Sequence, residues 1–153
     1  DAQLDRFFMR LSLGYMEREQ ELAVISRKFT LDIISQLSQT VSQEETDYVR
    51  NAYTEVQVSA DVAGYLMDIV QATRNESGFG TGVSTRGAMA LYKAAQVTAA
   101  ISGRDYVIPE DVKYVAPYVL CHRISGRGGL QAEETAAILK RIIQAVRVPL
   151  EKI

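Results

Sequence analysis

The 153-residue chain has one cysteine, Cys121, and one histidine, His122, side by side. A single cysteine cannot form a disulfide within the chain, and two adjacent side chains are too few ligands for a structural zinc site. No local spacing gives the histidine a carboxylate or hydroxyl partner, so a general base is not predicted. Structural roles are therefore expected for both residues.

The chain also lacks a strong excess of charge and any apolar run long enough to cross a bilayer. Its formal net charge of −2, with mixed signs, gives no general attraction to nucleic acid or to an anionic membrane. The first residues, DAQLDRFFMR, lack the apolar centre of a signal peptide. We therefore expect a soluble, cytoplasmic protein with no membrane or nucleic-acid partner.

Helical periodicity dominates what the chain does contain. Hydrophobic side chains make up 47% of the residues, enough for one sizeable core. The apolar spacing predicts an all-α fold, a helical bundle of about five helices, with a packed connection at residues 30–41. The helical segments are expected within residues 16–29, 42–53, 59–75, 85–103, 109–122 and 132–146.

The first 15 residues differ from the rest. Apolar side chains alternate at period two over residues 8–13, which indicates one short strand. A lone strand cannot pair its backbone groups, so it is expected to belong to a sheet supplied by residues before Asp1. Residues 1–15 are therefore interpreted as a remnant of another domain, and residues 16–153 as the helical domain.

Residues 82–109 organise the helical part. Ser84 is a suitable N-cap, so a helix is expected to begin at Thr85 and to end near Gly103 with a left-handed C-cap. Small residues cover much of this helix, which favours a position in the middle of the bundle. The glycine-rich residues 75–82 before it lack the Gly-x4-Gly-Lys-Ser/Thr phosphate loop and are interpreted as a mobile approach.

Arg86 is unusual at this helix start. A cation in the first helical turn opposes the helix dipole, at a cost of about 0.3–1 kcal/mol, unless an anion lies beside it. Helix N-termini present free amides to phosphates, so Ser84 and Arg86 together fit a terminal phosphate. The alternative is a solvated arginine with no ligand.

Several motifs together resemble one family over about residues 1–125. They are GVSTRG at 82–87, SGRDYVIPEDV at 102–112, VLCHRI at 119–124 and DAQLDRF at 1–7. In order and spacing they resemble the lid of the MoxR-type AAA+ ATPases and the end of that family's ATPase core. Thr85 and Gly87 stand where the family commonly has proline and alanine, and Gly87 is expected to loosen the helix start.

The resemblance implies functional roles. Arg6 would be an arginine finger that completes a neighbouring subunit's site. Arg86 would be the sensor 2 arginine, on the helix that Ser84 caps. The full-length protein would use ATP and Mg²⁺, with neither bound by this fragment alone. Its partners would be its own AAA+ core, the other subunits of a homo-oligomeric ring, expected to be a hexamer, and a von Willebrand factor A domain protein. The fragment lacks a phosphate loop, so no ATPase activity is expected from it alone.

Two alternatives remain open on sequence grounds. Similar lids occur in AAA+ motors that act on DNA, which would give a retarded DNA band with a steep salt dependence. A free-standing helical interaction module would have no connection to nucleotides. For Arg6, the alternative to a finger is an ion pair with Asp5 or another acid at a domain junction.

Overall fold

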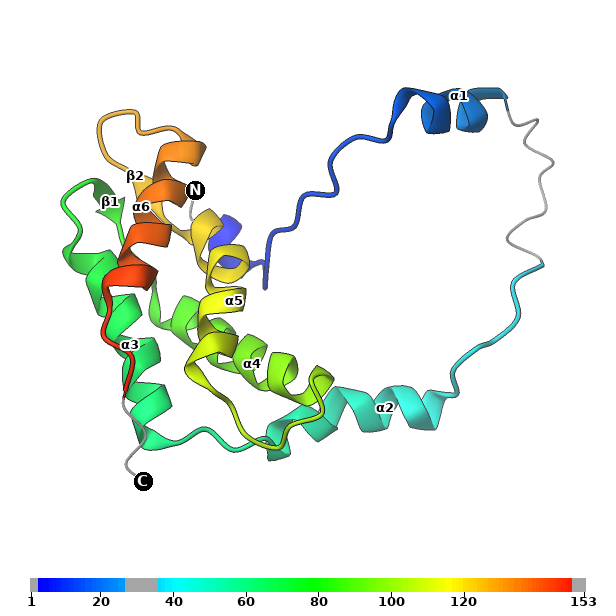
Figure 1. The fold of residues 1–153 in the computed structure, drawn as a ribbon, viewed down its shortest axis with the longest axis horizontal. Helices are drawn as coiled ribbons and strands as arrows, with labels where there is room; N and C mark the ends of the chain where they lie inside the picture. The colour runs from blue at the N-terminus through cyan, green and yellow to red at the C-terminus, as the bar shows by residue number, and fades with distance from the viewer. Residues whose placement is uncertain (1–2, 27–35, 150–153) are drawn as a thin grey trace. The chain divides into compact units, whose positions relative to one another are not determined.

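The computed structural model describes residues 3–26 and 36–149. The chain divides into two compact units, one made of Asp1–Arg10 with Asn51–Ile153 and the other of Leu11–Arg50. Figure 1 shows the order of the elements along the chain. The boundary expected at residues 15 and 16 stays a prediction.

The smaller unit contains two separate helices, α1 (Arg18–Ser26) and most of α2 (Gln43–Ala52). A capping box opens α2: Ser42 Oγ accepts from the Glu45 amide at 3.1 Å, and the Glu45 carboxylate accepts from the Ser42 amide at 2.8 Å. Neither helix has a buried residue. The end of the expected helix at 16–29 and the first half of the expected connection at 30–41 lie outside the described residues.

Residues 8–13 form no strand. A 3₁₀ helix, η1 (Leu4–Arg6), precedes them, and the backbone from residue 9 to residue 17 has no regular structure. The Arg10 amide donates to the Tyr118 carbonyl at 2.9 Å. A strand needs a neighbouring strand to satisfy its backbone groups, and none lies beside this segment in the described part of the chain.

Four helices make up the core of the larger unit, which confirms the all-α prediction. They are α3 (Ala60–Asn75), α4 (Thr85–Ile101), α5 (Pro109–Leu120) and α6 (Ala132–Ala145). Figure 1 shows α4 and α5 side by side, and their contact is the most extensive in the unit. The most deeply buried side chains come from all four helices: Ile69, Val70, Leu91, Ala99, Val112, Val119, Leu120 and Leu139.

Helix α4 has the start and position expected from the sequence. Ser84 Oγ accepts from the Gly87 amide at 3.1 Å, and the helix begins at Thr85. Gly103 follows the helix with φ +73°, a conformation that a side chain would strain. The small residues of α4 are buried at its contacts with α3 and α5, as a central helix requires.

The glycine-rich approach to α4 is packed, which differs from the mobile loop expected. Phe79–Thr81 (β1) pairs antiparallel with Ser125–Gly126 (β2), and Phe79 is buried. At Gly82, a Cβ atom would lie 2.6 Å from the Arg74 Cα atom. The missing side chain lets the loop pass directly against the end of α3, and this contact sets where Ser84 and α4 begin.

The chain turns after α5 and brings two polar side chains into the unit. Pro117 lies within α5, which continues to Leu120 and is followed by a 3₁₀ turn, η4 (Cys121–Arg123). The helix type thus changes four residues after Pro117. His122 and Arg123 of η4 are both buried. None of the described helices has the length and apolar character that a bilayer-spanning helix needs.

Candidate functional site

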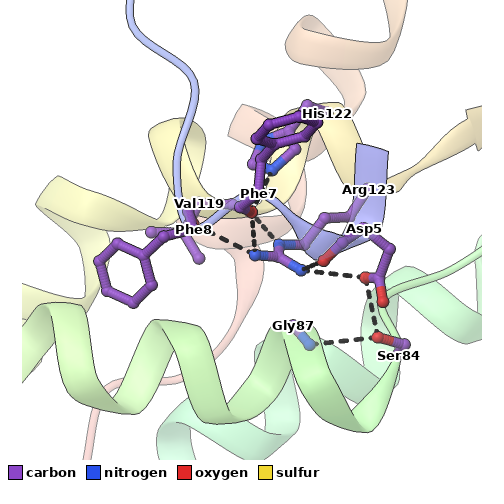
Figure 2. A network of polar contacts seen from close by, with 8 residues as sticks. All are labelled: Asp5, Phe7, Phe8, Ser84, Gly87, Val119, His122 and Arg123. Carbon is purple, nitrogen blue, oxygen red and sulfur yellow. Dashed lines mark hydrogen bonds and ion pairs between the residues drawn. The ribbon is translucent and has the colours of Figure 1, made fainter. Parts of the chain in front are cut away.

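The candidate site lies where η1, η4 and the start of α4 meet. Figure 2 shows its polar network, in which Asp5 lies between Ser84 of the α4 cap and Arg123 of η4. These three residues come from distant parts of the sequence but belong to one compact unit.

Arg123 forms the centre of the network. Its side chain is 1% exposed, and its Nε donates to the Val119 carbonyl at 2.8 Å. Nη1 donates to the carbonyl and, at 3.0 Å, to the carboxylate of Asp5, while Nη2 donates to the carbonyls of Phe7 and Phe8. A guanidinium has five N–H donors, and all five have an acceptor here. The cation is therefore fully paired although it is buried.

His122 supports the same segment. Its Nε2 lies 3.0 Å from the Phe7 carbonyl, and because a carbonyl only accepts, Nε2 carries the proton. Nδ1 is buried without a hydrogen-bond partner among the described residues. This arrangement agrees with the structural role expected for His122, since no carboxylate among the described residues orients its ring.

Asp5 connects the buried arginine to the helix cap. Ser84 Oγ donates to the Asp5 carboxylate at 2.9 Å, and Arg123 pairs with the same oxygen. Partial burial alone would raise the pKa of the Asp5 carboxyl. The hydrogen bonds from Ser84 and Arg123 and the positive charges of Arg123 and Arg86 outweigh that effect and lower its pKa below the usual 3.8. The folded state therefore favours the carboxylate form.

The lowered pKa of Asp5 predicts how acid affects stability. A carboxyl whose pKa is lower in the folded state stabilises the fold above its unfolded pKa, and that contribution is lost as the pH falls through the folded value. We expect the difference in unfolding free energy between the original chain and Asp5→Asn to shrink as the pH drops from about 6 to below the usual carboxyl pKa. Urea unfolding at a series of pH values measures this difference in free energy. A difference that stays constant with pH would contradict the prediction.

Arg6 and Arg86 lie on the surface beside the network. Their side chains are exposed, and neither has a hydrogen bond or ion pair within the described residues. The alternative pairing of Arg6 with Asp5 does not form, because the carboxylate of Asp5 is taken by Arg123 and Ser84. Arg86 lies close enough to Asp5 for its charge to lower the pKa of that carboxyl.

Ser84 is occupied on both sides of its hydroxyl. Its oxygen accepts from the Gly87 amide, and its proton is donated to Asp5. The hydroxyl therefore has no proton left to donate to a ligand. Its contribution is to fix the first turn of α4, which carries Arg86.

Gly87 makes room for Arg123. A Cβ atom at this position would lie 2.6 Å from Val83 Cγ1 and 3.1 Å from Arg123 Cδ. The glycine was expected to loosen the helix start, yet the Ser84 cap forms, and the space above Gly87 holds the stem of the buried arginine. In this chain, a side chain at position 87 would therefore have to displace Val83 or Arg123.

A cavity of about 450 Å³ lies against the network. Asp5, Ser84, His122 and Arg123 contribute to its wall, whereas Arg6 and Arg86 are not among its lining residues. The described residues contain no cluster of three or more histidine, cysteine or acidic side chains that could hold a metal ion. Burial raises the pKa of the nearby Cys121 thiol, so the thiol form is favoured there.

Sequence reasoning found the two exposed arginines but missed how their elements are held. Arg123 and Asp5 both lie within motifs that carry the family resemblance, VLCHRI and DAQLDRF. Their place in these motifs is the sequence feature that could have marked Arg123 and Asp5 as site residues. Their pairing could not be predicted from the sequence, because it joins residues 118 positions apart in the chain.

Known proteins resemble this chain in both sequence and structure. Residues 71–142 match the family model described as the AAA lid domain. The uncharacterized protein YeaC of Bacillus subtilis is 38% identical over 99% of this chain and 48% of its own length. The chaperone MoxR1 of Mycobacterium tuberculosis is 30% identical over 97% of this chain and 42% of its own length.

A solved structure supports the same assignment. The crystal structure of a candidate ATPase from Cytophaga hutchinsonii has a TM-score of 0.81 and 33% identity, over 97% of this chain and 48% of that one. The chain thus spans about half the length of the relatives it matches. With the helical fold, these matches confirm the resemblance found in the motifs: residues 71–142 carry an AAA lid domain, and the chain is similar to the C-terminal region of MoxR-family AAA+ proteins.

Proposed function

We propose that this chain is the sensor 2 lid of a MoxR-like AAA+ ATPase, in which Arg86 binds the terminal phosphate of ATP. The observation that carries the proposal is an exposed arginine in the first turn of a 17-residue helix, with no hydrogen bond or ion pair to any described residue. Such a cation opposes the helix dipole, and a bound phosphate would remove that cost. The nearby Asp5 carboxylate is already paired with Arg123, so Arg86 has capacity for an external anion.

The residues present fit one end of a nucleotide rather than a whole site. Arg86 supplies a guanidinium suited to phosphate oxygens, and Ser84 fixes the helix turn that presents it. ATP with Mg²⁺, when bound by the full-length protein, supplies the phosphate and the hydrolysis chemistry. Arg6, also exposed, is proposed as the arginine finger that offsets charge at the site of a neighbouring subunit.

The proposed role of the full-length protein follows its relatives. MoxR1 is named as a chaperone, so we infer an ATP-driven remodelling or maturation of partner proteins by a homo-oligomeric ring, in the cytoplasm. A von Willebrand factor A domain protein is proposed as a partner. The name of MoxR1 favours this class over a DNA motor, and the AAA lid match favours it over a free-standing helical module.

The test is Arg86→Ala in the full-length protein. We expect ATP turnover to fall by about tenfold, because a cation that stabilises transferred phosphate charge is lost. Lys93→Ala removes an exposed cation from the same helix and should leave turnover unchanged. In the 153-residue chain, Arg86→Ala should change the unfolding free energy by less than about 0.5 kcal/mol. Unchanged turnover in Arg86→Ala would refute the proposal.

A further inference from the structure

Asp5 connects the two segments that carry the exposed arginines. It precedes Arg6 within η1, and its carboxylate accepts from Ser84, 79 positions along the chain, at 2.9 Å. Ser84 caps α4, and Arg86 lies two residues further on. The Asp5 carboxylate thus joins η1, which contains Arg6, to the first turn of α4, which contains Arg86. Figure 2 shows the contact of Asp5 with Ser84 and that of Ser84 with Gly87.

Arg123 holds Asp5 and the residues that follow it in place. Its buried guanidinium binds the carboxylate and carbonyl of Asp5 and the carbonyls of Phe7 and Phe8. A planar fork with every donor satisfied fixes direction as well as distance, which a lysine ammonium cannot do. The segment around Arg6 is therefore attached through side-chain contacts from η4 and through Asp5 to the α4 cap.

We propose that Asp5, held by Arg123, is a positioning residue that fixes Arg6 relative to Arg86 by tying η1 to the first turn of α4. The inference rests on the roles given to these two arginines under the proposed function. Neither arginine has a hydrogen bond or ion pair of its own in the described part of the chain. Their positions therefore depend on η1 and α4, the elements that contain them. Asp5 belongs to η1, and its carboxylate bonds to Ser84 at the start of α4 and to Arg123.

A second ion pair in the same unit provides a matched control. Arg104 and Asp111 pair at 2.6 Å, with Asp111 5% exposed, at the end of α5 opposite η4. Asp111→Asn removes the carboxylate of a partly buried ion pair, as Asp5→Asn does, but its hydrogen bonds among the described residues go to Arg104 and Ile108, not to η1 or the α4 cap. It measures what loss of stability alone does to the activity.

The kinetic test uses the full-length protein. Asp5→Asn is expected to lower kcat for ATP about three- to tenfold with KM changed by less than about twofold. The double variant with Arg6→Ala should be no slower than Arg6→Ala alone, because Asp5 acts through the position of Arg6. Asp111→Asn should leave kcat unchanged.

Hydrogen exchange gives a readout that does not depend on turnover. Asp5→Asn is expected to speed exchange both at the Arg10 amide, which donates to Tyr118, and at the Gly87 amide, which donates to Ser84. Arg123→Lys should speed exchange at the same two amides. Asp111→Asn should change neither.

The outcomes separate the two proposals. If Arg6→Ala and Arg86→Ala leave turnover unchanged, the proposed function fails, and the role of Asp5 fails with it. If both arginine variants are slow while Asp5→Asn is not, or if the effects of Asp5→Asn and Arg6→Ala multiply, only the positioning role is overturned. Faster exchange at Arg10 without a change at Gly87 also overturns it.

Discussion

Replacing Arg123 by leucine should lower the unfolding free energy of the 153-residue chain by about 3 kcal/mol. Removing one partner of a buried ion pair costs about 3–5 kcal/mol, because the other charge and its acceptors are left uncompensated. The lower end applies here, since Asp5 is 26% exposed and keeps the hydroxyl of Ser84. Urea unfolding followed by circular dichroism measures the change.

An exposed arginine four residues further on provides the control. Arg127→Leu should change the unfolding free energy by less than about 0.5 kcal/mol, because its side chain lies on the surface of the unit. The unfolding free energy of Arg123→Lys should lie between those of Arg123→Leu and the original chain, since lysine keeps the charge but lacks the five N–H donors of the guanidinium. A loss in Arg123→Leu no larger than that in Arg127→Leu would contradict the central place given to this network.

Leu91→Ala should destabilise the chain by about 2–5 kcal/mol. Leu91 is 0% exposed in the middle of α4, where it packs among the four helices of the larger unit. The substitution leaves a cavity that close-packed neighbours fill only in part. Alanine favours the helix itself slightly more than leucine does, so the expected loss comes from packing alone.

Met89 provides the comparison on the same helix. It is 59% exposed, so Met89→Ala should cost less than about 1 kcal/mol in urea unfolding. Equal losses at positions 89 and 91 would mean that α4 is not the central helix of the bundle. A large loss at position 91 alone would support the packing described for α4 and α5.

Much of the fold was predictable because helix signals are local. The hydroxyl of Ser84 and the capping box of Ser42 and Glu45 act over three residues, so the starts of α4 and α2 follow from short stretches of sequence. The small residues that cover much of α4 indicated a central helix, and this pattern too can be recognised within one short segment. The predicted strand at residues 8–13 did not form, because strand formation depends on a partner rather than on the segment itself.

The site divides in the same way. Arg6 and Arg86 were identified from motif position and from the conflict between a cation and a helix N-terminus, both of which are local features. The position of Gly82 against Arg74, and the pairing of β1 with β2, could not be derived, because backbone approach depends on the packed fold. These contacts turn a glycine-rich stretch into the fixed support of the α4 cap.

The sequence by itself determined the helices, their caps, the family of the lid and the two arginines proposed to meet a nucleotide. Only the tertiary structure decided that Asp5 pairs with Arg123 instead of Arg6, and that this pair reaches the cap of α4 through Ser84. The physical reason is the sequence separation of the interacting residues: a helix cap or an apolar face depends on residues only a few positions apart. A buried guanidinium finds its acceptors wherever folding brings unpaired oxygens together, here 118 positions away.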